Sequence, residues 1–188
     1  MSATFHVVET ELLASLVGQL LELVRDQPGK QRHTDDPLAA VLGGLDDEAS
    51  RPTDPVVLRL FPDAYQTDDE AAAEFRKFTE RSLRETKAGA AATVLASLMT
   101  ADQAQRTEAP ENSDKVKVDL DGDQAEAWLR TLTDLRLALG TRLGVEQDDD
   151  DHWDALPEDD PRRHVHDVYQ WLGFVQETLV RALATGLG

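Results

Sequence analysis

The sequence contains no cysteine among its 188 residues. This absence excludes disulfide bonds, thiolate metal sites and any redox switch that depends on a thiol. No apolar run approaches the roughly 20 residues that a transmembrane helix needs, and residues 1–8 lack the basic region and the apolar run of a signal peptide. We therefore expect a cytoplasmic protein without a membrane span.

Basic residues are scarce: 19 Lys and Arg stand against 37 Asp and Glu, which gives a net charge of -18. Such a surface repels nucleic-acid phosphates, which proteins bind chiefly through Lys and Arg, and it repels anionic lipid headgroups. We therefore expect no membrane binding and no direct binding to nucleic acid. A high negative charge also keeps a protein soluble, so the charge alone does not identify a partner.

Signatures of catalysis are missing as well. The glycines do not form a phosphate-binding loop, and no serine stands in a nucleophile-elbow motif. Paired carboxylates are so numerous in this chain that no pair marks a site. The sequence therefore predicts a protein that is not an enzyme and holds no cofactor.

One group of residues late in the chain still suggests metal binding, because imidazoles and carboxylates can hold Zn²⁺ or Mn²⁺. His164 and His166 stand two residues apart, so on a helix they point about 200° away from each other. This spacing argues against a shared metal, and a metal-dependent enzyme is the weakest of our hypotheses. The residues concerned are His152, His164, His166, Asp167 and the acidic run 148–151.

Hydrophobic periodicity predicts a mainly α-helical protein, a bundle of about five helices in one domain over residues 1–188. Two alternating patterns, at 5–7 and 116–120, predict short strands that can pair as a ribbon. We expect a mobile connector at about 101–114 and an acidic loop at about 146–160. The helices are predicted at 10–25, 38–42, 56–61, 67–100, 123–143 and from 161 almost to the end.

Two of the predicted helices carry apolar residues at steps of three and four, and we expect these residues to be buried together. Trp171 and Phe174 lie beside this seam, and such large aromatic side chains need a second surface to exclude water. We expect either a fuller core within the chain or a two-fold homodimer that uses the last helix. The seam residues are Trp128, Leu132, Leu135, Leu139, Leu172, Val175 and Leu179.

A basic cluster interrupts the acidity along the predicted helix at 67–100. It could form a docking stripe for an acidic partner, and it is the only candidate for a basic recognition helix that reads DNA. The alternative is pairing along the helix, because Glu80 stands four residues before Arg84 and Arg81 stands four before Glu85. The five possible partner-binding residues are Arg76, Lys77, Arg81, Arg84 and Lys87.

Three sequence blocks, taken together, resemble an uncharacterised actinobacterial family of unknown function that is usually encoded beside the ClpS proteolytic adaptor. The resemblance covers nearly the whole chain, and some members of the family are described as oxidative-stress regulators. The blocks run from Asp54-Pro55 through Leu60-Phe61-Pro62-Asp63 to Glu74-Phe75-Arg76, from Ala127-Trp128-Leu129-Arg130 to Arg142-Leu143-Gly144, and from Val168-Tyr169-Gln170-Trp171 to Gln176-Glu177-Thr178-Leu179.

The resemblance implies a regulatory or adaptor role through protein contacts. The partner would be a sigma factor in stress-responsive transcription, or a proteolytic adaptor near the Clp protease. Regulators of this family sense oxidant through a cysteine pair, and this chain has no cysteine, so that part of the implied function does not apply. Our first hypothesis is therefore a non-enzymatic interaction protein, and the alternative is a helical DNA-binding regulator.

Overall fold

The computed structural model describes residues 1–25, 53–65, 67–108, 114–146, 152–153 and 155–186. Helices dominate this part of the chain, and a small antiparallel ribbon accompanies them, so the predicted fold class is confirmed. The predicted helix at 38–42 lies outside the described residues. The elements are β1 (Ser2–His6), α1 (Val7–Arg25), α3 (Pro55–Leu60), α4 (Asp69–Glu108), β2 (Lys115–Asp119), α5 (Gly122–Leu143) and α7 (Pro161–Gly186).

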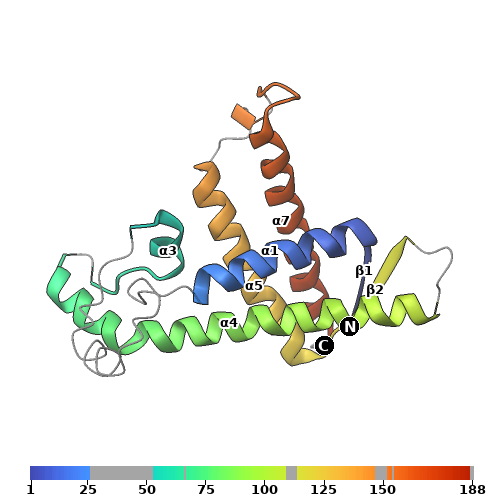
Figure 1. The fold of residues 1–188 in the computed structure, drawn as a ribbon, viewed down its shortest axis with the longest axis horizontal. Helices are drawn as coiled ribbons and strands as arrows, with labels where there is room; N and C mark the ends of the chain where they lie inside the picture. Colours follow the sequence, from blue (N-terminus) through green and yellow to red (C-terminus); the bar gives the residue numbers. More distant parts are fainter. Residues whose placement is uncertain (26–52, 66, 109–113, 147–151, 154, 187–188) are drawn as a thin grey trace, which may run out of the picture.

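Helix α4 is the longest element and runs along one side of the molecule (Figure 1). Helices α1 and α5 both pack on α4, and the ribbon packs near its C-terminal end through β2. Helix α7 packs on α5, so α5 lies between the long helix and the last one. None of the described helices is both long and apolar enough to cross a membrane.

The predicted seam forms the core between α5 and α7. Trp128, Leu132 and Leu135 of α5 are buried with Leu172 and Leu179 of α7. The two remaining seam residues, on the same two helices, are half-buried at the border of this core. The spacing argument therefore identified the correct helix faces. The residues at the border are Leu139 and Val175.

Cap residues explain where two of the helices begin. Asp54 precedes α3, and its carboxylate accepts a hydrogen bond from the backbone N–H of Val56 at 2.8 Å. Asp121 and Gln124 form a capping box at the start of α5, each bonding the other's backbone N–H. Gly144 ends α5 with a φ of 72°, a left-handed conformation that suits glycine.

The connector that we expected at 101–114 is wrong for its first eight residues, because α4 continues to Glu108. Ala101 is buried in the core, which anchors the helix beyond residue 100. Asp102 and Arg106 then form an ion pair of 2.9 Å one turn apart. The absence of an apolar pattern suggested a loop, but one buried alanine and local pairing are sufficient to continue a helix that is already formed.

The ribbon joins the beginning of the described chain to its middle. Strands β1 and β2 are antiparallel, with Ser2 opposite Asp119 and Phe5 opposite Val116. The ring of Phe5 stacks on the buried Trp128 of α5, with 5.8 Å between the ring centroids. The side of the ribbon that carries Phe5 therefore faces the helices.

Candidate functional site

The five basic residues predicted as a docking stripe lie on the first half of α4, but they do not share one exposed face. Arg76 and Arg84 point inward, with side chains only 10% and 5% exposed. The ammonium of Lys87 is also directed toward another helix. Only Lys77 and Arg81 are exposed to solvent.

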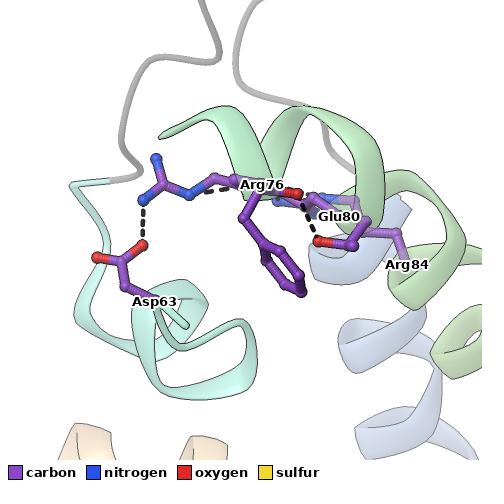
Figure 2. A network of polar contacts seen from close by, with 6 residues as sticks. Asp63, Arg76, Glu80 and Arg84 are labelled. Carbon is purple, nitrogen blue, oxygen red and sulfur yellow. Dashed lines mark hydrogen bonds and ion pairs between the residues drawn. The ribbon is translucent and has the colours of Figure 1, made fainter. Parts of the chain in front are cut away.

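Arg76 takes part in an ion-pair network that holds the segment after α3 against α4 (Figure 2). Its guanidinium donates to the carboxylate of Asp63, and both side chains are nearly buried. On its other side lies Glu80, with 3.9 Å between Nε and the nearer carboxylate oxygen. A buried pair of this kind is costly to break, because removing one partner leaves the other as an uncompensated charge.

Arg84 extends the same network to α1. Its guanidinium donates to Glu80 at 2.7 Å and to the backbone carbonyl of Val24 at 3.0 Å, near the C-terminal end of α1. The ring of Phe61 lies beneath the guanidinium carbon at 4.5 Å, a cation–π contact. One side chain thus joins α1, α4 and the end of α3.

Lys87 connects α4 to α5. Its ammonium donates to the carboxylate of Asp134 at 2.6 Å, and the Asp134 side chain is only 7% exposed. The exposed Arg81 pairs with Glu85 at 3.0 Å, so both predicted pairings along the helix are present. Most of the basic cluster is therefore engaged within the chain, and it offers few free cations to a partner.

The histidines considered for metal binding are arranged around an aromatic side chain. The ring of His166 stacks on the buried Trp153, with centroids 4.6 Å apart, and His152 meets the same indole edge-on. His164 is exposed, and the acidic run 148–151 lies outside the described residues. In the part of the chain that the structure describes, no three His, Asp or Glu side chains converge as metal ligands would.

Asp160 is strongly acidic at the start of α7. Its carboxylate accepts hydrogen bonds from the guanidinium of Arg162 and from the backbone N–H of the same residue, the latter at 2.9 Å. These bonds favour the ionised form and lower the pKa of Asp160 to about 2. The predicted start of the last helix at Asp160-Pro161 is therefore confirmed, and the carboxylate supplies the cap.

Arg136, which no sequence pattern singled out, lies between α5 and α7. Its guanidinium sits over the ring of Tyr169 at 5.0 Å and donates to the side-chain oxygen of Gln176 at 3.0 Å. Gly173 lies beside it, and a Cβ at that position would be in van der Waals contact with the guanidinium carbon at 3.4 Å. An arginine in the middle of an apolar helix was the available signal, because such a residue needs partners on the facing helix.

A groove between the ribbon and α7 was also not predicted from the sequence. The groove has a volume of about 280 Å³ and is lined by β1 and by Phe174, Val175 and Thr178 of α7. Phe174 is 68% exposed, whereas Trp171 is half-buried against the core. The described chain does not cover Phe174, so the expected fuller core is wrong at this residue, and the homodimer stays a prediction.

The family model for the domain of unknown function DUF2017 matches residues 1–183. Proteins of Mycobacterium bovis and Mycobacterium tuberculosis that are named oxidative stress regulator AosR are 31% identical over 183 residues, which covers 93% of this chain and 78% of theirs. A Mycobacterium leprae protein, provisionally named for the same function, is 34% identical over 192 residues with the same coverage. No solved structure matches this chain.

Proposed function

The chain belongs to the DUF2017 family, and we propose that it is a regulatory protein of the oxidative-stress response that acts through contacts with other proteins. The observation that carries this proposal is the similarity, over 93% of the chain, to proteins named as oxidative stress regulators. The family model spans residues 1–183, which include β1, α1, α3, α4, β2 and α5 and most of α7.

The lack of cysteine restricts how such a regulator can work. It cannot sense an oxidant through a thiol pair, because the sequence contains no cysteine. Non-enzymatic action by docking agrees with this restriction. The partners that we propose are a sigma factor or an adaptor of the Clp protease.

The distribution of charge supports protein contacts over direct DNA binding. Three of the five clustered cations on α4 are engaged with Asp63, Glu80 and Asp134, so they are not available to neutralise phosphates. The whole chain carries a charge of -18, which opposes the approach of a duplex. A basic patch on a partner protein would instead be attracted to this surface.

Deletion of the gene tests the stress-response part of the proposal. We expect the deletion strain, exposed to hydrogen peroxide, to induce its oxidative-stress transcripts differently from the parent strain. Expression of the chain from a second locus should restore the parental response. A deletion strain whose transcripts match those of the parent with and without peroxide would remove the basis of the proposal.

The contact part of the proposal needs a separate measurement. We expect chemical crosslinking in living cells, followed by affinity purification, to link this chain to a sigma factor or a Clp adaptor. The interaction should then be reproduced with the two purified proteins. If the purified chain instead binds a promoter duplex tightly at physiological salt without a partner, the DNA-binding alternative is correct.

A further inference from the structure

One edge of the ribbon is open. In the antiparallel pair, Leu120 donates its N–H to the carbonyl of Met1 at 2.8 Å, and Val7 donates to the carbonyl of Asp114 at 2.8 Å. Along a strand, the backbone N–H and C=O groups of successive residues point alternately toward and away from the neighbouring strand. The groups of Ala3 therefore bond to β2, and those of Ser2 and Thr4 point away from it.

The backbone of His6 shows where this open edge stops. Its N–H donates to the carboxylate of Glu9 at 2.6 Å, and its carbonyl accepts from the hydroxyl of Thr10 at 3.1 Å. Both groups are thus engaged by the first turn of α1. Within the described residues no strand pairs with this side of β1, so the N–H and C=O groups of Ser2 and Thr4 form a short free edge.

The groove of about 280 Å³ lies directly beside this edge. It is lined by the residues of β1 on one side and by Phe174, Val175 and Thr178 of α7 on the other. Trp128, on which Phe5 stacks, also contributes to the lining. The apolar face of α7 therefore lies on the same side of the ribbon as Phe5. If a strand were added at the open edge of β1, every second side chain of that strand would contact this face.

The groove differs from the rest of the molecule in its charge. None of the residues that line it has a charged side chain, although the chain as a whole carries -18. The one formal charge on a lining residue is the N-terminal ammonium of Met1, which already donates to the carbonyl of Leu120 at 2.7 Å, and the field of the whole chain repels a carboxylate. The groove therefore favours a peptide segment whose side chains inside the groove are apolar and whose flanking residues are neutral or basic.

We propose that β1 and α7 form a docking site for an extended segment of a partner protein, which adds a third strand at the edge of Ser2 and Thr4. Its alternate apolar side chains contact Phe174, and its flanks carry no acidic residue. Backbone pairing supplies affinity and the groove supplies specificity, as in other sites that bind peptides by strand addition. The proposal rests on the proposed function, because such a site needs a protein partner.

A second copy of this chain fits the site less well than a foreign segment. Pairing of two β1 edges would use only Ser2 and Thr4 from each copy, since His6 is already engaged. It would also bring together two bodies of charge -18 at a surface whose lining side chains carry no charge. The short edge of β1 limits a foreign segment in the same way, but a neutral or basic segment does not encounter this repulsion.

The test uses the whole purified chain and a synthetic probe of eight residues. The probe alternates valine and threonine between two terminal lysines, and a control probe carries glutamates at its ends. We expect backbone amide NMR signals of Ser2, Thr4 and residues 174–182 to shift on addition of the lysine probe, with a Kd below about 1 mM. The glutamate probe should bind at least about fivefold more weakly at low salt, and the difference should shrink as salt is raised.

Three variants locate the binding. Thr4→Pro removes the outward N–H and keeps the bonds between β1 and β2, because proline is tolerated at a free strand edge. Phe174→Ala removes the exposed ring on α7. Each variant should weaken probe binding at least about fivefold, and circular dichroism should show an unchanged fold. Phe78→Ala is the matched control: that ring on α4 is 75% exposed and lies outside the groove, so binding should stay within about twofold.

Several results would overturn the docking site. One is the absence of shifts at probe concentrations of about 1 mM, and another is an equal loss of binding in Phe78→Ala and Phe174→Ala. A third is a shift of Ser2 that depends on protein concentration alone and disappears in Thr4→Pro, since a second copy would then occupy the edge. The two proposals can fail independently. A normal peroxide response in the deletion strain would contradict the proposed function, but the purified chain could still bind the probe.

Discussion

The guanidinium of Arg84 is surrounded by groups from three parts of the chain. Glu80 supplies a carboxylate, Val24 a backbone carbonyl and Phe61 an aromatic face. Its neighbour Arg81 has the same chemistry but is 82% exposed and has one partner on the same helix. Two arginines three residues apart thus have very different environments, and this contrast can be measured.

We predict that Arg84→Ala lowers the free energy of unfolding by roughly 3 kcal/mol, because it leaves Glu80 and the carbonyl of Val24 without their donor. Arg81→Ala, which removes an exposed pair, should lower it by less than about 0.5 kcal/mol. Urea denaturation followed by circular dichroism measures both values. Equal losses in the two variants would show that burial of Arg84 does not determine its contribution.

The low pKa of Asp160 predicts a defined dependence on pH. The folded pKa of about 2 lies below the ordinary value of 3.8, so the interaction with Arg162 stabilises the fold fully above about pH 4. The contribution is then lost as the pH falls from there through 2. NMR titration of the carboxyl carbon should give a pKa near 2, and Arg162→Ala should return it toward 3.8. Arg181→Ala, which removes another exposed pair on α7, should leave it unchanged.

Among the secondary-structure elements, α5 and α7 pack against each other along the predicted seam. Arg136 joins the same interface through Tyr169 and Gln176. The seam is apolar at its centre and polar at its border. Substitutions at the centre should therefore have larger effects than substitutions at the border.

Leu135→Ala should lower the free energy of unfolding by roughly 2–5 kcal/mol, because this side chain is buried and its removal leaves a cavity. Leu139→Ala, one turn further along the same helix and only half-buried, should have a clearly smaller effect. Thermal and chemical denaturation of the two variants provide the comparison. An effect of Leu135→Ala below about 0.5 kcal/mol would exclude it from the core.

The helices could be predicted because their signals are local. Seam spacing located α5 and α7, and the Asp-Pro pairs located the starts of α3 and α7. The candidate site could not be predicted in the same way. The pairing of Arg76 with Asp63 and the groove beside Phe174 depend on which elements meet in space. Hydrophobic periodicity describes one helix or strand at a time. It therefore identifies the buried face of that element, but not the element that packs against it.

At the scale of the whole molecule, the negative charge opposes compactness. A charge of -18 on 188 residues makes the surface carboxylates repel each other, and this repulsion weakens when salt screens it. The ion pairs that hold α4 to its neighbours are largely buried and are screened much less. Salt should therefore remove more repulsion than attraction.

We predict that the midpoint of thermal unfolding at pH 7 rises as sodium chloride increases from about 0.02 M to about 0.5 M. At pH 4.5, near the isoelectric point, the same increase in salt should have little effect, because the net charge there is close to zero. Differential scanning calorimetry at the two pH values measures this. A midpoint that falls with salt at pH 7 would mean that exposed ion pairs outweigh the repulsion.

The ribbon has a consequence for how the protein is made on the ribosome. Its two strands are separated by 117 residues between Ser2 and Asp119. At roughly 5–20 residues per second, β1 leaves the ribosome about 6–23 s before its partner strand does. During the first part of this delay, until Asp69–Glu108 has emerged, α1 has neither α4 nor α5 to cover its apolar face. The nascent chain therefore exposes an uncovered helix and an unpaired strand, the two features that chaperones of newly made proteins recognise.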